Sequence, residues 1–182
     1  MSSIQRNSTI KLGEIYFWTA SINKWQNLLL HDGYKEIIID SLGFLSSHNK
    51  IDVFSFVIMP NHIHLIWRIN EDNGKESVKG SFLKYTAHQF KKKLLVENSK
   101  ELNKYKVKKV NKSYEFWQRD PLAVPVYSID VINQKLDYIH NNPVTENYAL
   151  VQNPADYKYS SARYYLEGIN EFSFLKDIRD EL

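Results

Sequence analysis

Two histidines, His62 and His64, stand one residue apart in the apolar stretch 56–67, FVIMPNHIHLIW. The composition of 62–69 is typical of a strand, and alternate residues of a strand point to the same face. Both imidazoles should therefore leave the strand on one side, with Ile63 on the other. Two neutral imidazoles so placed can share a divalent metal, and imidazole suits several metals, zinc included. Histidines that only pack or form hydrogen bonds are the other interpretation of this pattern.

A second set of reactive side chains lies in the stretch 136–144, LDYIHNNPV. Tyr138 and Asn142 are four residues apart, so in a helix they share one face. A phenol needs a metal or a base to react at neutral pH, and an amide oxygen can bind a hard cation such as magnesium. One helix could thus supply a nucleophile and a third metal ligand, although most of the 12 tyrosines must be packing or surface residues. His140 points to another face and is expected to be structural or a phosphate contact.

The elements that would position these residues follow from hydrophobic periodicity and turn signals. Strands are expected over 15–22, 51–59, 62–69 and 121–127, and helices over 33–47, 77–96 and 129–141. The inward positions of the second helix should be Val78, Phe82, Tyr85, Phe90 and Leu94. Pro60 and Asn61 predict an antiparallel hairpin, Ser128 a helix cap and Pro143 a helix end.

The order of these elements predicts an α+β fold. We expect a ferredoxin-like antiparallel sheet (β-α-β-β-α-β) with helices on one face and an added C-terminal helix, the candidate catalytic helix, that carries Tyr138. The prolines of the strand at 121–127 place that strand at a sheet edge.

Length and composition limit the class of protein. The 182 residues, 43% hydrophobic and 25% charged, predict a single domain over 1–182 with a tail from about 154. The absence of cysteine excludes a disulfide framework and a thiolate zinc site. No apolar run reaches the ~18 residues of a membrane span, and the N-terminus has no apolar signal core. We therefore expect a cytoplasmic protein with no membrane partner.

Positive charge is concentrated in one part of the chain. The net charge is only +3, but eleven lysines and two glutamates lie between 79 and 112, with a lysine-rich loop expected near 97–113. Such a field attracts polyanions, and nearby rings such as Phe90, Tyr105 and Tyr114 could stack on bases. A solvated helix face followed by a loop is the alternative. The candidate DNA-binding lysines are Lys84, Lys91, Lys92, Lys93, Lys104, Lys106, Lys108 and Lys109.

Four motifs in order carry a resemblance to a known family. They are MPNHIHLIW (59–67), FWQR (116–119), DYIHNNPV (137–144) and YSSARYY (159–165). This set resembles the single-tyrosine HUH transposases, in which HUH denotes two histidines flanking a hydrophobic residue. The resemblance is strongest to the branch called REP-associated tyrosine transposases, and it runs from about residue 14 to residue 165.

The resemblance implies a metal-dependent endonuclease and strand transferase that acts on single-stranded DNA at hairpin-flanked sites. It implies that His62 and His64 bind magnesium or manganese, that Asn142 is a further ligand of the ion, and that no other cofactor is bound. Tyr138 would attack phosphorus and leave a 5′-phosphotyrosine and a free 3′-OH. Trp117, Gln118 and Arg119 become further DNA-binding candidates, although the segment after them is less charged and less aromatic than is usual in the family.

Two other functions fit parts of the pattern. A ferredoxin-like sheet can be a non-catalytic nucleic-acid-binding module, but the aromatic-glycine run of RNA-recognition domains is absent. An HUH replication initiator or relaxase-type nickase would keep the chemistry with another biological role, and the short chain with one tyrosine helix favours the transposase. Relatives can be dimers in which the tyrosine helix of one chain completes the partner's site, so monomer and homodimer both stay open.

Overall fold

The computed structural model describes residues 10–109, 112–119 and 121–181. In these residues a four-stranded antiparallel sheet has the order β2-β3-β1-β6. Its strands are β1 (Ile15–Ser21), β2 (Ile51–Ile58), β3 (His62–Ile69) and β6 (Leu122–Pro125). The main helices are α1 (Asp32–Ser47), α2 (Val78–Glu97), α4 (Ile129–Asn141) and α5 (Ala162–Glu167). The expected α+β class, antiparallel sheet and edge position of β6 are confirmed.

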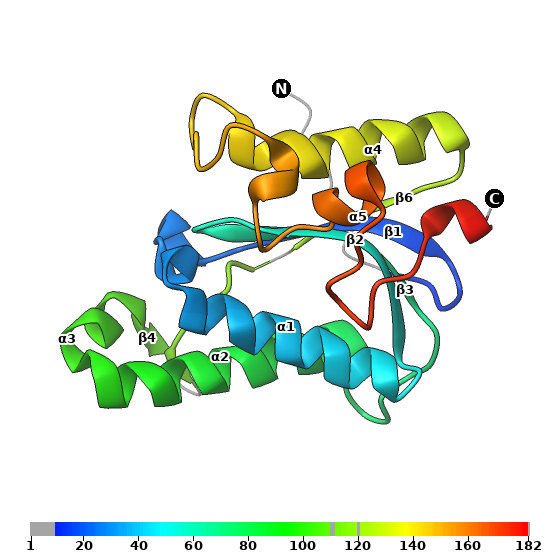
Figure 1. Ribbon diagram of the computed structural model, residues 1–182. Helices are drawn as coiled ribbons and strands as arrows, with labels where there is room; N and C mark the ends of the chain where they lie inside the picture. The colour runs from blue at the N-terminus through cyan, green and yellow to red at the C-terminus, as the bar shows by residue number, and fades with distance from the viewer. Residues whose placement is uncertain (1–9, 110–111, 120, 182) are drawn as a thin grey trace, which may run out of the picture.

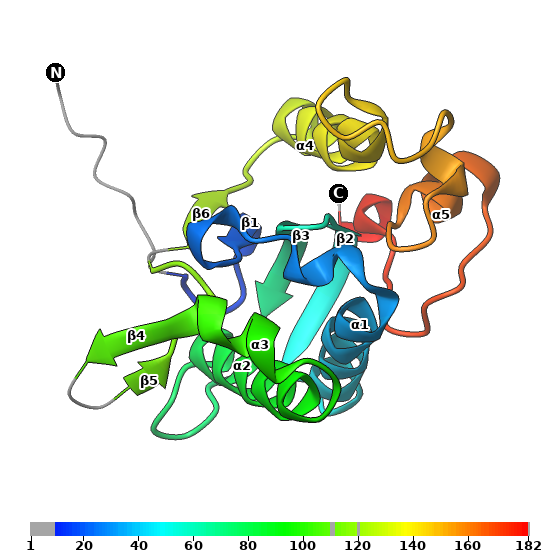
Figure 2. The ribbon, with the colours of Figure 1, turned by 90° about the vertical axis from the view of Figure 1, so that its left-hand side faces the viewer.

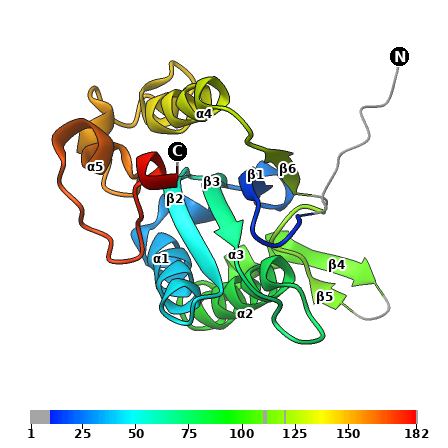
Figure 3. The same cartoon turned by 90° about the vertical axis from the view of Figure 1, so that its right-hand side faces the viewer.

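The sheet has a helical layer on each face. Helices α1 and α2 lie side by side on one face, whereas α4 covers the other, with α5 beside it (Figures 1 and 2). A separate ribbon of β4 (Lys106–Lys109) and β5 (Lys112–Tyr114) extends to one side on the α2 layer, as Figure 3 also shows. None of the described helices is long and apolar enough to cross a membrane.

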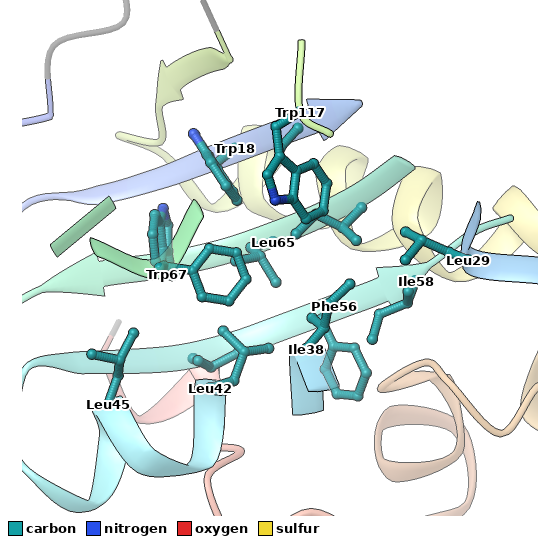
Figure 4. Close-up of a cluster of buried hydrophobic side chains, with 14 of the residues drawn as sticks. Trp18, Leu29, Ile38, Leu42, Leu45, Phe56, Ile58, Leu65, Trp67 and Trp117 are labelled. Carbon is teal, nitrogen blue, oxygen red and sulfur yellow. The ribbon is translucent and has the colours of Figure 1, made fainter. Parts of the chain in front are cut away.

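Strand β3 divides its side chains between two cores. Leu65 and Trp67 are fully buried in the cluster beneath α1 and α2 (Figure 4), whereas Ile66 belongs to a second cluster on the α4 face. Burying one such aliphatic side chain contributes about 1.5–3 kcal/mol. A slip by one residue would exchange these two faces, so the apolar residues fix the register that aims His62 and His64 toward α4.

Helix α4 begins and ends where the sequence predicts. The Ser128 Oγ accepts a hydrogen bond from the Val131 amide at 3.3 Å, and the helix ends one residue before the cap that precedes Pro143. Ile132 and Ile139 are buried in the second cluster. This apolar side docks α4 on the sheet and leaves its other side open to solvent.

His140 anchors α4 to the sheet. Its Nε2 lies 2.9 Å from the Ser161 Oγ and 3.3 Å from the Ser55 Oγ. The same Ser161 Oγ accepts a hydrogen bond from the Phe56 amide at 3.0 Å. These groups join α4, strand β2 and the start of α5 through buried contacts, as the expected structural role of His140 requires.

Replacing Ser161 with alanine should destabilise the fold by about 1–3 kcal/mol, because the buried Phe56 amide and His140 nitrogen would lose a partner. Urea unfolding followed by circular dichroism would measure the change. Ser113→Ala, at an exposed serine of β5, is the control and should stay within about 0.5 kcal/mol of wild type. An unchanged midpoint for Ser161→Ala would contradict the anchoring role.

The segment expected as a loop near 97–113 is ordered where it is described. It forms α3 (Ser99–Leu102) and then the ribbon of β4 and β5. Tyr105 is fully buried and its ring stacks on Phe116 at 4.7 Å, while Val107 is half-buried between exposed lysines. This alternation is a strand signal that the density of charge obscured.

One expected side-chain position is wrong, and one candidate for DNA binding is buried. Tyr85 is exposed, and Thr86 takes its inward place on α2. Trp117 is buried in the core shown in Figure 4, and its Nε1 donates a hydrogen bond to the Thr86 Oγ1 at 2.9 Å. Because its ring packs inside the molecule, Trp117 does not offer a surface on which a DNA base could stack.

Candidate active site

His62 and His64 lie at one end of β3 and face α4. Their ring centroids are 4.6 Å apart and both side chains are buried. Thr19 pairs with His64 in the sheet, and its Oγ1 lies 2.7 Å from the His64 Nδ1. The His62 Nδ1 lies 2.7 Å from the Oδ1 of Asn61, which also accepts a hydrogen bond from the Tyr148 hydroxyl at 3.1 Å. Since Asn61 Oδ1 is an acceptor, the His62 Nδ1 donates, and its Nε2 keeps a lone pair.

Burial keeps the two imidazoles neutral. It lowers the pKa of His62 to about 4. It also lowers the pKa of His64 well below the ordinary value of 6.5, and His62 and the Lys135 ammonium lower it further. Among the described residues, the His64 Nε2 is a buried nitrogen without a hydrogen-bond partner. Neutral imidazoles with an unused nitrogen are the form that binds a metal, so this donor set fits a divalent cation.

Helix α4 places Tyr138 beside this pair. Its ring centroid lies 5.1 Å from that of His64 and 5.9 Å from that of Phe17, in edge-on contacts. Tyr138 is 51% exposed, so a substrate can reach the phenol. These contacts form within one chain, and no residue of a second copy is needed to bring the three groups together.

Asn142 occupies the C-cap of α4, one turn beyond Tyr138, and is buried. Its side chain makes no hydrogen bond to either histidine in the described structure, so its role as a metal ligand stays a prediction. The described residues also contain no cluster of three or more His, Asp or Glu side chains that could hold a metal. A metal here would therefore use two imidazoles together with amide or substrate oxygens.

A cation that the sequence did not single out lies next to the pair. Lys135 precedes Tyr138 by three residues, on the same side of α4. Its Nζ lies 4.8 Å from the centroid of the Phe17 ring, which stacks on His64 at 5.3 Å. No described carboxylate lies within ion-pair distance of this ammonium. An unpaired cation beside a nucleophile can attract a phosphate group.

The lysines expected to bind DNA lie elsewhere. They belong to α2, to the short turn η3 (Asn103–Tyr105) and to β4, on the opposite side of the sheet from α4 (Figures 1 and 2). The exposed ones are Lys84, Lys92, Lys104, Lys106 and Lys108, and Lys91 and Lys93 are half-buried, whereas the side chain of Lys109 lies outside the described structure. A strand of DNA that touched both these lysines and the histidine pair would have to pass around the sheet.

Gln118 and Arg119 lie nearer to the histidines. The Gln118 amide donates to the Ser21 carbonyl at 2.8 Å, and Ser21 pairs with His62 in the sheet. Arg119 is exposed, with its Nε 3.6 Å from a carboxylate oxygen of Glu115. The backbone of Gln118 is therefore joined to the end of β1 that lies beside His62, and Arg119 is the next residue in the chain.

Several site residues were not expected from the sequence. Thr19 and Phe17 belong to β1, and their contact with His64 depends on a strand register that one sequence does not reveal. Asn61 precedes His62 directly, and Lys135 lies one helical turn before Tyr138. The spacing of these last two could have indicated them.

Comparisons of the sequence and of the structure each find known proteins that are similar to this chain. No family model matches the chain. A Haemophilus influenzae protein named as a candidate REP-associated tyrosine transposase is 27% identical over 168 residues, which cover 88% of this chain and 85% of that protein. A solved structure of a REP-associated tyrosine transposase bound to a REP hairpin has a TM-score of 0.62 at 19% identity, covering 98% of this chain and 93% of that one. The chain thus resembles the REP-associated tyrosine transposases in sequence along most of its length and in fold, which confirms the resemblance that its four motifs indicated.

Proposed function

We propose that this protein is a transposase that cuts and rejoins single-stranded DNA at hairpin-flanked sites through Tyr138. The similar Haemophilus protein carries the family name, and the similar structure holds a REP hairpin. The observation that carries the proposal is the position of the exposed Tyr138 ring, 5.1 Å from the ring of His64 in a pair of buried imidazoles. A nucleophile beside a pair of metal-binding nitrogens suits phosphoryl transfer to tyrosine.

His62 and His64 would hold magnesium or manganese, and Asn142 would be a further ligand. The unpartnered Nε2 of His64 supports this assignment. When bound, the ion polarises the scissile phosphate and reduces its repulsion of the nucleophile. Thr19 and Asn61 would orient the two rings through their Nδ1 atoms, which leaves both Nε2 atoms for the metal.

The proposed reaction balances around one phosphorus atom. The Tyr138 phenol loses its proton to solvent and its oxygen bonds to phosphorus, while the bond from phosphorus to the 3′-oxygen breaks and that oxygen takes a proton from solvent. The products are a 5′-phosphotyrosine and a free 3′-OH. In the joining step a 3′-OH attacks the same phosphorus and releases the tyrosine. The covalent link keeps the cut end close, which raises its effective concentration for that second step.

Lys135 would add positive charge beside the reacting phosphate. Lys135→Met keeps an apolar stem against Phe17 but removes the charge, and we expect cleavage to slow about 10-fold or more. Single-turnover cleavage of a labelled oligonucleotide measures this rate. Lys135→Arg should retain most of the activity, and Lys75→Met, in an exposed loop before α2, should retain all of it. A wild-type rate for Lys135→Met would remove Lys135 from the site.

The experiment that tests the proposed function is incubation with single-stranded hairpins from the flanks of the gene. The readout is a covalent protein–DNA adduct on a denaturing gel, with Mg²⁺, with Mn²⁺ or with EDTA. We expect an adduct with either metal and none in EDTA. A non-catalytic binding module would instead hold the DNA equally well in EDTA and would give neither an adduct nor a cleaved strand.

A further inference from the structure

Trp25 is an exposed aromatic residue at the edge of the candidate active site. It closes the turn η1 (Asn23–Trp25) that follows strand β1, and 54% of its surface is exposed. The other three tryptophans, Trp18, Trp67 and Trp117, are buried. Trp25 therefore differs from the other tryptophans in that its indole ring is accessible to a ligand.

The backbone holds Trp25 in an unfavourable conformation. Lys24 and Trp25 both have φ of 56°, in the left-handed region that non-glycine residues rarely adopt. Hydrogen bonds hold the turn in place: the Asn23 amide donates to the Phe116 carbonyl at 2.6 Å, and the Ile22 amide donates to the Asn61 carbonyl at 2.8 Å. Strain of this kind persists where the surrounding structure enforces it, and such residues cluster at functional sites.

The ring that this turn presents lies next to His62. The centroids of Trp25 and His62 are 5.9 Å apart in an edge-on contact, and the ring of Tyr148 is also near His62, at 5.8 Å. Lys24, the neighbour of Trp25, is exposed and has no carboxylate partner among the described residues. An aromatic face with an adjacent cation is the arrangement on which single-stranded nucleic acids bind, since bases stack and phosphates pair with the charge.

We propose that Trp25 is a base-stacking site for a nucleotide that flanks the scissile phosphate, with the Lys24 ammonium beside the DNA backbone. The choice of single-stranded DNA as the ligand rests on the proposed function. Stacking tolerates any base, because every base has a π-face. The site would thus position the strand at His62 without reading its sequence.

Tryptophan fluorescence tests this site without any cleavage. The experiment uses the Tyr138→Phe variant in EDTA, so that no cleavage occurs. The probe is an unlabelled DNA oligonucleotide that forms a hairpin with a single-stranded flank. Because the other tryptophans are buried, acrylamide should quench mainly Trp25. We expect bound DNA to quench this emission and to protect it from acrylamide, and Trp25→Phe should remove the accessible component.

Affinity gives a second readout. We expect Trp25→Ala to weaken binding of the single-stranded flank about 10- to 100-fold, and Trp25→Phe to restore most of it. Phe44→Ala, at an exposed aromatic of α1 on the other face of the sheet, should bind as wild type. Circular dichroism of Trp25→Ala checks that the chain is folded.

The outcomes separate this inference from the proposed function. Saturating binding with no quenching, no protection and no loss in Trp25→Ala overturns the stacking site, whether or not the wild type forms an adduct. Quenching and weakened binding, combined with no adduct from the wild type in Mg²⁺ or Mn²⁺, support the site and contradict the proposed chemistry. DNA that does not bind at all contradicts both.

Discussion

The variant Tyr138→Phe should form no covalent adduct with DNA. The substitution removes only the hydroxyl oxygen that would bond to phosphorus. The phenylalanine ring can keep the edge-on contacts with His64 and Phe17, because these involve the ring and not the hydroxyl. Cleavage should fall at least about 10³-fold, as expected when a covalent nucleophile is lost. Denaturing gels of labelled DNA would measure both adduct and cleaved product.

A matched control lies just before the same helix. Tyr127 is 82% exposed, so Tyr127→Phe removes a hydroxyl that is at least as accessible and should leave adduct formation unchanged. Binding of the hairpin should survive in both variants, because neither change removes charge. If Tyr138→Phe forms the adduct at the wild-type yield, another side chain is the nucleophile and the assignment of Tyr138 is wrong.

The sequence predicted the local structure of the site well and its tertiary setting poorly. The alternation around Ile63 and the caps of α4 are local patterns, and the structure has the histidines on one face and the helix over its predicted span. The contact of Phe17 with both His64 and Tyr138 depends on how β1 pairs and where α4 docks. The pairing of β1 and the docking of α4 depend on the packing of the whole core, so the sequence near these residues does not predict them.

Charge obscured the local structure of one segment. Lysine density suggested a loop, but exposed lysines alternate there with Tyr105 and Val107, and the segment leads into a two-stranded ribbon on the other side of the sheet from Tyr138. Binding of DNA by these lysines stays a prediction. The cation whose charge acts on His64 is instead Lys135, a single lysine among mostly uncharged residues of α4. A sum of charges over a window reports electrostatic attraction over a long range, but it does not locate the one charge that a site uses.

Loss of either histidine should remove metal-dependent cleavage. His62→Ala and His64→Ala each delete one of the two imidazoles, and we expect cleavage in Mg²⁺ or Mn²⁺ to fall on the order of 10²-fold or more. Calorimetric titration with Mn²⁺ should show weaker binding in the same variants. Chelation of the wild type with EDTA should have at least as large an effect as either substitution, because it removes the ion altogether.

Stability must be separated from chemistry in this test, since His64 is buried and its Nδ1 lies 2.7 Å from the Thr19 Oγ1. His64→Gln keeps a polar group near that hydroxyl and should be more stable than His64→Ala. If His64→Gln still cleaves no faster than His64→Ala, the loss of cleavage is due to the missing imidazole and not to unfolding. His88→Ala, at an exposed histidine of α2, should cleave as wild type. Cleavage that continues at the wild-type rate in EDTA, or in a double variant that lacks both histidines, would show that the pair serves packing alone, because a reaction that needs the metal cannot proceed without its ligands.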